Sequence, residues 1–346
     1  MIEIENMGGA STSEAVPKSI YQRRRFMTII SRALTFAVGL LAASVALSQS
    51  YPSAPVTLVV PFAAGSGTDA VARIVARKLS ERLKQTVLVD NKAGANAQIG
   101  ALFVAKAKPD GYTLLMTTNT SHSANPSLVL NLKYDPIKDF TPITRVGELP
   151  FVLVVNKNDQ AKTLKEWIDL AKLNPGKFSY ATPNSTSLVA SETIKRIAGL
   201  DVVGIPYKSS PQALTDLIGG SIQMYVVDTG SGMGMIKSGG VRVLGVTTKE
   251  PLSSMPGIPP IAKVVPGFDL TSWNGIFGPA GTPKPIADKL NSELQEVLAD
   301  KEVQKALGLL GFETWPTKTP EEFAKYVADQ LAQWGTLIKQ AGISPE

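Results

Sequence analysis

Residues 65–69, Gly-Ser-Gly-Thr-Asp, combine the residue types that bind an anion. They follow residues 56–60, a β-branched and apolar run typical of a strand covered on both faces, and they precede apolar residues at helical spacing. The glycines permit a tight turn with open N–H groups, and Thr68 or Asp69 can cap the helix. Free amides and the positive end of the helix dipole then point at one spot, so we expect an anion site here.

A second polar segment, residues 182–187, reads Thr-Pro-Asn-Ser-Thr-Ser. It separates a strand expected at residues 178–181 from a helix expected from about residue 188 to residue 198. Three hydroxyl groups at one loop end exceed what a helix cap requires, so we expect at least one of them to contact a ligand. If the two loops belong to two domains, they face each other across a cleft.

Most catalytic machinery is missing from the composition. The chain has no cysteine and a single histidine, His122, which excludes disulfides, thiolate metal sites, cysteine nucleophiles and multi-histidine metal centres. His122 lies in the hydroxyl-rich segment 117–123, which we expect to be a solvated loop with this histidine at its surface. Asp228-Thr-Gly resembles the tripeptide of aspartic proteases, but those enzymes need two copies and the chain has one. We therefore expect no catalytic residue and no metal.

Several side chains have two readings each. Ser66 and Thr68 are ligand hydroxyls or cap residues, whereas we expect Asp69 to be structural, with Arg73 one turn on as its partner. Asp228 ends a predicted strand and faces any cleft, where it would bind a ligand hydroxyl or amine or accept a hydrogen bond at a hinge. Two aromatic residues would stack on an aromatic ligand or pack at a hinge: Tyr207 and Trp273.

Strand and helix patterns alternate along the chain, which favours parallel or mixed sheets with helices on both faces. Such sheets bind ligands beyond the carboxyl ends of their strands. The expected strands are residues 56–60, 86–89, 112–116, 151–155, 178–181, 202–205, 222–227 and 242–246. The expected helices include residues 97–106, 164–173, 188–198 and 211–218, and three at the C-terminal end, 285–300, 302–309 and 321–341.

The N-terminus has the order of a secretory signal peptide. Arginines at positions 23–25 precede an apolar run at residues 33–47 and small residues near position 48, so we expect residues 1–48 to be cleaved on export. The arginine cluster also fits a twin-arginine signal beside the general secretory route, and Met27 is an alternative start. The full chain has a net charge of +6, and removal of residues 1–48, with their five basic and three acidic residues, would leave 30 − 26 = +4. This mild and scattered excess suits an anionic ligand and not nucleic acid.

The chain resembles the solute receptors of tripartite tricarboxylate transporters, also called Bug-type periplasmic receptors. The resemblance runs from about Tyr51 to Gly342, nearly the whole mature chain. It rests on a set of short motifs in a fixed order: residues 51–52, 61–69 with 72–73, 109–115, 134–136 with 138–140, 206–208, 213–220 and 278–283.

This resemblance implies a type II-like periplasmic binding protein, with two α/β domains of mixed sheets hinged around a ligand cleft. It places residues 49–149 and 272–346 in the first domain and residues 150–271 in the second. It implies a monomer without a cofactor or enzymatic activity that binds a small organic carboxylate through loop amides and hydroxyls. Domain closure would then signal to a membrane permease.

The sequence departs from the family pattern at the candidate site. Ser66 replaces the second of two adjacent glycines, Ser209 replaces a glycine, and the second loop has Pro183, Asn184 and Ser185 where glycines around an asparagine are usual. The altered loop makes an aromatic carboxylate, such as a benzene dicarboxylate, a candidate beside citrate-like and dicarboxylic acids. The expected ligand-binding residues are Phe62, Ala64, Gly65, Ser66, Gly67, Thr68, Asn184, Ser185, Thr186, Ser187, Tyr207 and Asp228.

The first loop has an alternative function. Gly65, Gly67 and Ala70 also fit the spacing of a dinucleotide-binding fingerprint, and Asp90 closes the next strand at about the expected distance. This pattern predicts an exported NAD(P)-dependent oxidoreductase. Against it stand the ordered family motifs and the lack of a clear catalytic acid.

Overall fold

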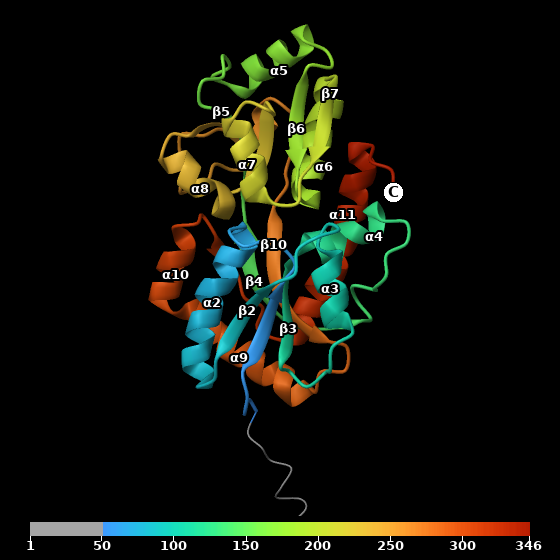
Figure 1. Cartoon of the computed structure of the whole chain (residues 1–346), viewed down its shortest axis with the longest axis vertical. Coiled ribbons are helices and arrows are strands. Elements are labelled where there is room, and N and C mark those ends of the chain that lie inside the picture. Colours follow the sequence, from blue (N-terminus) through green and yellow to red (C-terminus); the bar gives the residue numbers. More distant parts are fainter. Residues whose placement is uncertain (1–50) are drawn as a thin grey trace, which may run out of the picture. The chain divides into compact units, whose positions relative to one another are not determined.

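Two β-sheets organise residues 51–346, which are the residues that this computed structural model describes (Figure 1). The predicted signal peptide lies outside the described residues. Residues 52–346 form one compact unit. No helix among the described residues is long and apolar enough to cross a membrane.

The first sheet is mixed and has the strand order β11-β4-β10-β3-β1-β2. Strands β1, β2 and β3 are parallel, while β10 runs antiparallel to both β3 and β4, and β11 pairs antiparallel with β4. The bounds are β1 (Val56–Val60), β2 (Val87–Asn91), β3 (Thr113–Thr118), β4 (Phe140–Leu149), β10 (Ser272–Pro279) and β11 (Glu313–Thr314).

The second sheet is also mixed and has the order β7-β6-β8-β5-β9. Strand β6 is parallel to β7 and β8, whereas β5 is antiparallel to β8 and β9. The chain enters this sheet at Pro150, directly after β4, and returns to the first sheet where β10 begins. The bounds are β5 (Phe151–Asn156), β6 (Phe178–Thr182), β7 (Val202–Pro206), β8 (Met224–Asp228) and β9 (Val241–Val246).

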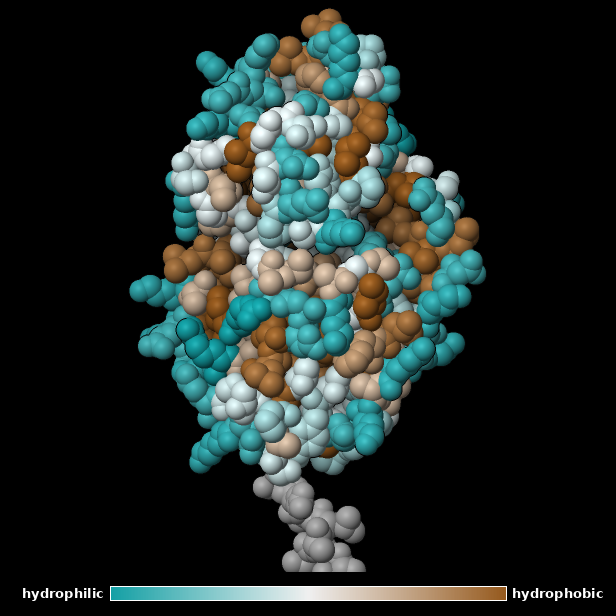
Figure 2. Space-filling view, in the orientation of Figure 1, coloured by the Kyte–Doolittle hydropathy of each residue, from teal (hydrophilic) through white to brown (hydrophobic). Residues whose placement is uncertain are grey.

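We call each sheet with its own helices a half of the structure. The first half has α2 (Gly67–Leu83), α3 (Gln98–Ala105), the π-helical turn η1 (Thr120–Ala124), α4 (Asn125–Leu128), α9 (Lys284–Ala299) and α10 (Lys301–Gly308). The second half has α5 (Leu164–Leu173), α6 (Ser185–Ala198), α7 (Ser210–Ile218), α8 (Thr229–Lys237) and the 3-10 turn η2 (Ile261–Lys263). Hydrophilic residues cover much of the face shown in Figure 2, with separate apolar patches among them.

The C-terminal helix α11 (Pro320–Ala341) packs against both halves (Figure 1). Its first turns place Phe323 and Val327 in the apolar cluster of the first sheet, with Trp273 and Phe277. Its last turns place Trp334 and Ile338 in a cluster with residues of the second sheet. The two halves therefore share an apolar contact along this helix.

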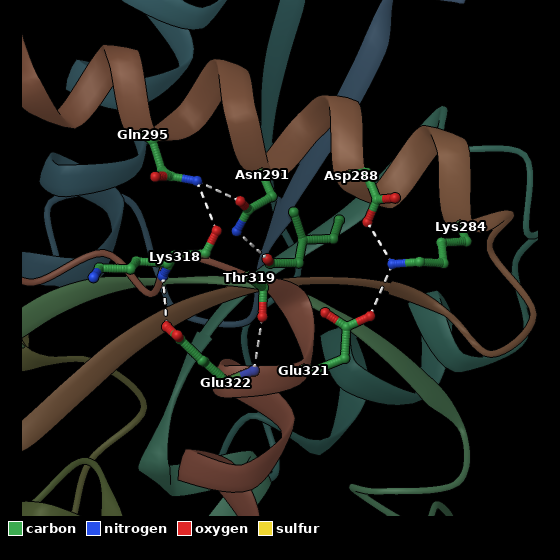
Figure 3. A network of polar contacts seen from close by, with 9 residues as sticks. Lys284, Asp288, Asn291, Gln295, Lys318, Thr319, Glu321 and Glu322 are labelled. Carbon is green, nitrogen blue, oxygen red and sulfur yellow. Dashed lines mark hydrogen bonds and ion pairs between the residues drawn. The ribbon is translucent and has the colours of Figure 1, made fainter.

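Polar contacts fix the start of α11 against α9 (Figure 3). Thr319 caps α11 by accepting a hydrogen bond from the backbone N–H of Glu322 at 3.2 Å. The Asn291 side chain on α9 donates to the carbonyls of Ile143 at 2.9 Å and of Thr317 at 3.3 Å. Helix α9 and the entry to α11 are thereby tied to the edge of the first sheet.

The alternation of strands and helices and the three C-terminal helices agree with the sequence prediction. Strands β4, β10 and β11 and helix α8 were not predicted. Helix α8 contains three glycines, which lower helix propensity, and one of them has a packing reason. A Cβ atom at Gly230 would lie 2.7 Å from the Cα atom of Gly67 in the other half.

Candidate functional site

Helix α2 begins directly at the predicted anion loop. Ser66 is its N-cap, with extended backbone angles, and its Oγ accepts a hydrogen bond from the Asp69 N–H at 3.3 Å. The expectation that Thr68 or Asp69 caps this helix was therefore wrong. Because glycine is a weak helix former, the sequence did not indicate that Gly67 already belongs to the first turn of the helix.

Asp69 has the structural role that the sequence predicted. One carboxylate oxygen accepts from the Gly65 N–H at 2.9 Å, and the other accepts from Asn91 at 2.9 Å and pairs with Arg73 at 2.9 Å. Burial opposes ionisation of Asp69, but the hydrogen bonds from Arg73, Gly65 and Asn91 outweigh it and hold the Asp69 pKa below its ordinary value. The first loop is thus braced from within its own half.

Helix α6 begins at the second loop, three residues earlier than predicted. Asn184 is its N-cap and accepts from the Ser187 N–H at 2.9 Å. The Ser187 hydroxyl donates to the carbonyl of Val226 at 2.7 Å, so it is turned into the second half. In sequence, residues 185–187 resemble a polar loop because they contain no apolar residue. A helix is recognised from the spacing of its apolar residues, and that spacing begins only after this first turn.

Three hydrogen bonds cross from one half to the other near these helix ends. The Gly67 N–H donates to the Ser231 hydroxyl at 2.9 Å. Asn119 donates to the Thr186 hydroxyl at 3.0 Å, and Asn96 donates to the Ser185 hydroxyl at 2.9 Å. The N-termini of α2 and α6 therefore meet across the boundary between the two sheets.

A small cavity lies where these elements meet. Its volume is about 20 Å³, which is room for a single water molecule. Seven of the twelve predicted ligand residues line it: Phe62, Ser66, Gly67, Thr68, Asn184, Thr186 and Asp228. Six further residues complete the lining: Thr118, Thr120, Leu149, Phe151, Ser210 and Ser272.

The other five predicted ligand residues lie outside this lining. Ala64 is exposed, the Gly65 N–H is bonded to Asp69, and the Ser185 hydroxyl accepts from Asn96. Ser187 faces Val226, as described above. Tyr207 donates to Asp216 at 2.8 Å and lines a second pocket of about 680 Å³ next to the C-terminal residues. Asn184 lines both pockets.

The additional lining residues come from segments whose role the sequence did not reveal. Thr118 ends β3, and Thr120 begins the π-helical turn; the surrounding segment was predicted to be a solvated loop but is buried. Two of its hydroxyl groups bond each other, those of Thr117 and Ser121 at 2.6 Å, whereas the Ser123 hydroxyl has no partner within residues 51–346. Single serines such as Ser210 carry no sequence signal at all.

His122 contradicts the expectation of a surface residue. It is completely buried, and its ring lies 4.0 Å from that of Phe277 in a stacked arrangement. Burial lowers the pKa of His122 to about 3, so its ring is neutral near pH 7. It belongs to the core of the first half and does not line the cavity.

Asp228 lies at the carboxyl end of β8 and caps helix α8. Its carboxylate accepts from the Ser231 N–H at 2.7 Å, from the Ser231 hydroxyl at 2.9 Å and, more weakly, from Ser210 at 3.5 Å. Burial raises the Asp228 pKa above its ordinary value, against the effect of these hydrogen bonds. A Cβ atom at Gly67 would lie 2.0 Å from this carboxylate, so only glycine fits opposite it.

Trp273 is a core residue. It packs edge to face on Phe323 at 5.9 Å and is buried in the first half, whereas its neighbour Ser272 lines the cavity. Of the two readings of Trp273, packing is the one that the structure supports. The apolar part of the lining comes instead from Phe62, Leu149 and Phe151.

The dinucleotide reading of the first loop gains no support. The N–H groups of Gly65 and Gly67, which would cradle a pyrophosphate, donate to Asp69 and Ser231. Asp90 pairs with Lys92 at 3.0 Å. Among residues 51–346 there is also no cluster of three acidic, histidine or cysteine side chains that could hold a metal.

The fold defines the class of protein: it is a mixed α/β periplasmic binding protein fold with two sheets. R. palustris Rpa4515 with adipate has a TM-score of 0.83 and 32% identity, covering 86% of this chain and 100% of that chain. The periplasmic binding protein BugD has a TM-score of 0.82 and 35% identity, with 86% and 100% coverage. MatC from Rhodopseudomonas palustris with bound malate has a TM-score of 0.79 and 30% identity, with 83% and 100% coverage.

The chain belongs to the tripartite tricarboxylate transporter receptor family, whose sequence profile matches residues 71–343. A relative from Bordetella bronchiseptica, a protein of the UPF0065 group, is 36% identical, covering 91% of this chain and 95% of its own length. Protein BugT of Bordetella pertussis is 31% identical, with 85% and 91% coverage. These findings confirm the resemblance that the sequence motifs indicated.

Proposed function

We propose that this solute-binding receptor captures a small organic carboxylate between its two halves and presents it to a membrane permease. The observation that carries the proposal is the meeting of two helix N-termini, α2 and α6, at one hydroxyl-lined cavity. Each terminus offers a partial positive charge and a backbone N–H group that is not used in capping, and the two come from different halves. An acid bound there would hold the halves together.

Backbone and hydroxyl donors supply the expected affinity. The amides of Thr68 and Thr186, each in the first turn of its helix, have no hydrogen-bond acceptor within residues 51–346. Hydrogen bonds to a charged group contribute about 1.5–3 kcal/mol each, so four or five suffice for micromolar binding after ordering costs. Among the described residues, no lysine, arginine or histidine lines the cavity, so fixed dipoles alone would neutralise the carboxylate.

The size of the cavity requires movement. A space of about 20 Å³ does not admit a dicarboxylate. We propose that the halves separate to take up the ligand and then close around it. We propose that they move as the two domains expected from the sequence, residues 49–149 with 272–346 and residues 150–271. The backbone crosses between them after β4 and before β10, where a hinge would lie.

The relatives suggest the ligand class. Structures of two similar proteins contain adipate and malate, which are aliphatic dicarboxylates. We propose an acid of this size for this chain, with aromatic dicarboxylates as the alternative because Phe62 and Phe151 line the cavity. In the part of the chain that the structure describes, the only titratable lining residue is Asp228, so we also propose that the bound acid is not chemically transformed.

A ligand screen tests the proposal. Protein purified from the periplasm of an expressing host would be scanned by thermal shift and titration calorimetry against adipate, L-malate, citrate, phthalate and NAD. At a hundredfold excess over the dissociation constant, a ligand stabilises the folded state by about 2.7 kcal/mol. We expect at least one acid to do so, and its dimethyl ester to have no effect. Stabilisation by NAD alone would overturn the proposal and support the dehydrogenase reading.

A further inference from the structure

Asn274 on β10 is an exception among the buried asparagines of the described residues. It is completely buried, yet neither its Oδ1 nor its Nδ2 has a hydrogen-bond partner within residues 51–346. Asn119, Asn125 and Asn291 are also buried, and each donates at least one hydrogen bond at 2.9–3.1 Å. A buried amide without partners costs folding free energy, so its presence calls for a function.

Asn274 is a strand neighbour of residues that line the cavity but is not itself part of the lining. In the register of the first sheet it lies opposite Thr118 of β3, which lines the cavity. Directly paired side chains of antiparallel strands share a face, with their Cβ atoms about 4.5–5.5 Å apart. Ser272, two residues earlier on the same face of β10, also lines the cavity. Trp273, between them, points to the opposite face and into the core.

The neighbours of Asn274 form hydrogen bonds with other groups and none with its side chain. The Thr118 hydroxyl accepts from the Thr120 N–H at 3.1 Å, and the Ser272 hydroxyl donates to Asn119. On the other side lies Gly147 of β4, which has no side chain to offer. A Cβ atom there would lie 2.0 Å from the Glu313 carbonyl oxygen, so glycine is required at this position.

We propose that Asn274 forms the floor of the acid-binding site and recognises a hydroxyl or amide group on the bound acid. This inference rests on the proposed function. An uncharged side-chain amide donates through Nδ2 and accepts through Oδ1, so both atoms are satisfied only by a group that itself accepts and donates. A second carboxylate only accepts and would leave Oδ1 unpaired. The ligands favoured by this floor are therefore hydroxy acids or amide-bearing acids over plain dicarboxylates.

Two matched pairs of acids test this recognition: L-malate with succinate, and 2-hydroxyadipate with adipate. Calorimetry on the unmodified protein will show which of the two pairs binds more tightly. Within that pair, the hydroxylated acid should have at least a tenfold higher affinity than the plain acid. Asn274→Leu keeps the side-chain volume and removes both polar atoms. In this variant the preference should fall to less than about threefold, with the affinity for the plain acid little changed and the melting temperature not lowered.

A control variant separates recognition from stability. Asn291→Leu removes a buried asparagine that bonds the backbone of the first sheet, so it should lower the melting temperature and leave the hydroxyl preference unchanged. The inference is overturned if the unmodified protein shows no such preference, or if Asn274→Leu weakens both acids equally. If Asn274→Leu does not fold, Asn274→Ala replaces it in the same measurements. If no acid of the screen binds the unmodified protein, the proposed function itself fails.

Discussion

The N-termini of α2 and α6 are built from similar residues but are held in different ways. The loop before α2 is braced within its own half, because Asp69 bonds the Gly65 N–H, Asn91 and Arg73. The second loop and the first turn of α6, residues 182–187, contain no charged residue, and the Ser185 and Thr186 hydroxyls accept hydrogen bonds from the opposite half. The first loop is fixed whether or not the halves meet, and the second is completed by their meeting.

This difference separates two tasks that a closing receptor must perform. The braced loop holds its amides in place before a ligand arrives, which lowers the ordering cost of binding. In the proposed movement, the second loop would lose its partners Asn96 and Asn119 when the halves separate and regain them on closure. Ser66 illustrates the division: its hydroxyl is used as a helix cap, whereas the Thr186 hydroxyl reaches across the boundary.

The largest expected effect comes from preventing the approach of the braced loop to the second half. In Gly67→Ala, the added methyl group would lie 2.0 Å from the Asp228 carboxylate and 2.7 Å from Leu149. Closure should fail, and the affinity for the acid found in the screen should fall by about a hundredfold, equivalent to about 2.7 kcal/mol. Gly234→Ala on α8 is the matched control, since open space surrounds that glycine. Titration calorimetry would measure both, and normal affinity in Gly67→Ala would show that this contact is not part of the bound state.

Asp69→Asn tests the contacts of the Asp69 carboxylate that fix the first loop within its own half. Loss of the ion pair and of the charged hydrogen bonds should lower the free energy of unfolding by about 1–2 kcal/mol, a modest value because the Arg73 side chain is 53% exposed. The Asp69 pKa is lowered, so this stabilisation is present above its ordinary value of 3.8 and is lost as the pH falls through the folded-state pKa. Chemical denaturation at pH 7 and at low pH would measure the difference, which should shrink at low pH. An equal difference at both pH values would contradict the charge-based account.

Thr186→Val and Ser187→Ala distinguish hydroxyls that reach the cavity from those that do not. Thr186 lines the cavity and accepts from Asn119, so its loss should weaken acid binding by about tenfold, or about 1.4 kcal/mol. Ser187 bonds Val226 within the second half, so its loss should lower the melting temperature and change affinity by less than about twofold. Calorimetry beside thermal denaturation would separate the two effects. The reverse pattern would place the ligand on the other side of this helix end.

The smallest expected effect concerns Asp228, which faces the braced loop from the second half. Asp228→Asn retains a capping oxygen and removes a buried negative charge from an anion site, so affinity should rise by about threefold. The Asp228 pKa is raised, so the stability contributed by its protonated form is present at low pH and is lost as the pH rises through the folded-state pKa. The affinity gain of the variant, measured by calorimetry across a pH series, should therefore grow as the pH rises through that folded-state pKa. Weaker binding by the variant at pH 7 would indicate that Asp228 instead accepts a hydrogen bond from a ligand hydroxyl or amine.

The sequence predicted the local frame of the site well. A covered strand, a glycine turn and a helical period are local patterns, so the β1–α2 unit and the Asp69–Arg73 pair followed directly from residues 56–79. Hydroxyl groups were harder to assign, because a serine at a helix end caps the helix, bonds a carbonyl or faces a ligand depending on its rotamer. Ser66 and Ser187 show the first two of these outcomes.

Contributions from distant segments could not be predicted. The polar segment 117–123 is buried only because β10 and α11 return from far along the chain to cover it. His122 therefore reads as a surface residue in sequence and stacks on Phe277 in the structure. The lack of partners at Asn274 likewise depends on a strand register that joins three separate regions of the chain.

The shared apolar contact along α11 has a mechanical consequence. Trp334 and Ile338 are buried against the second half while Phe323 and Val327 are buried against the first, and parting the halves at this side would expose large apolar surfaces to water. The side of the boundary formed by α2 and α8 is held by the Gly67–Ser231 hydrogen bond, and we expect its separation to cost less. If the halves separate as proposed, we therefore expect α11 to keep its contacts with both halves and the opening to form on the side of α2 and α8.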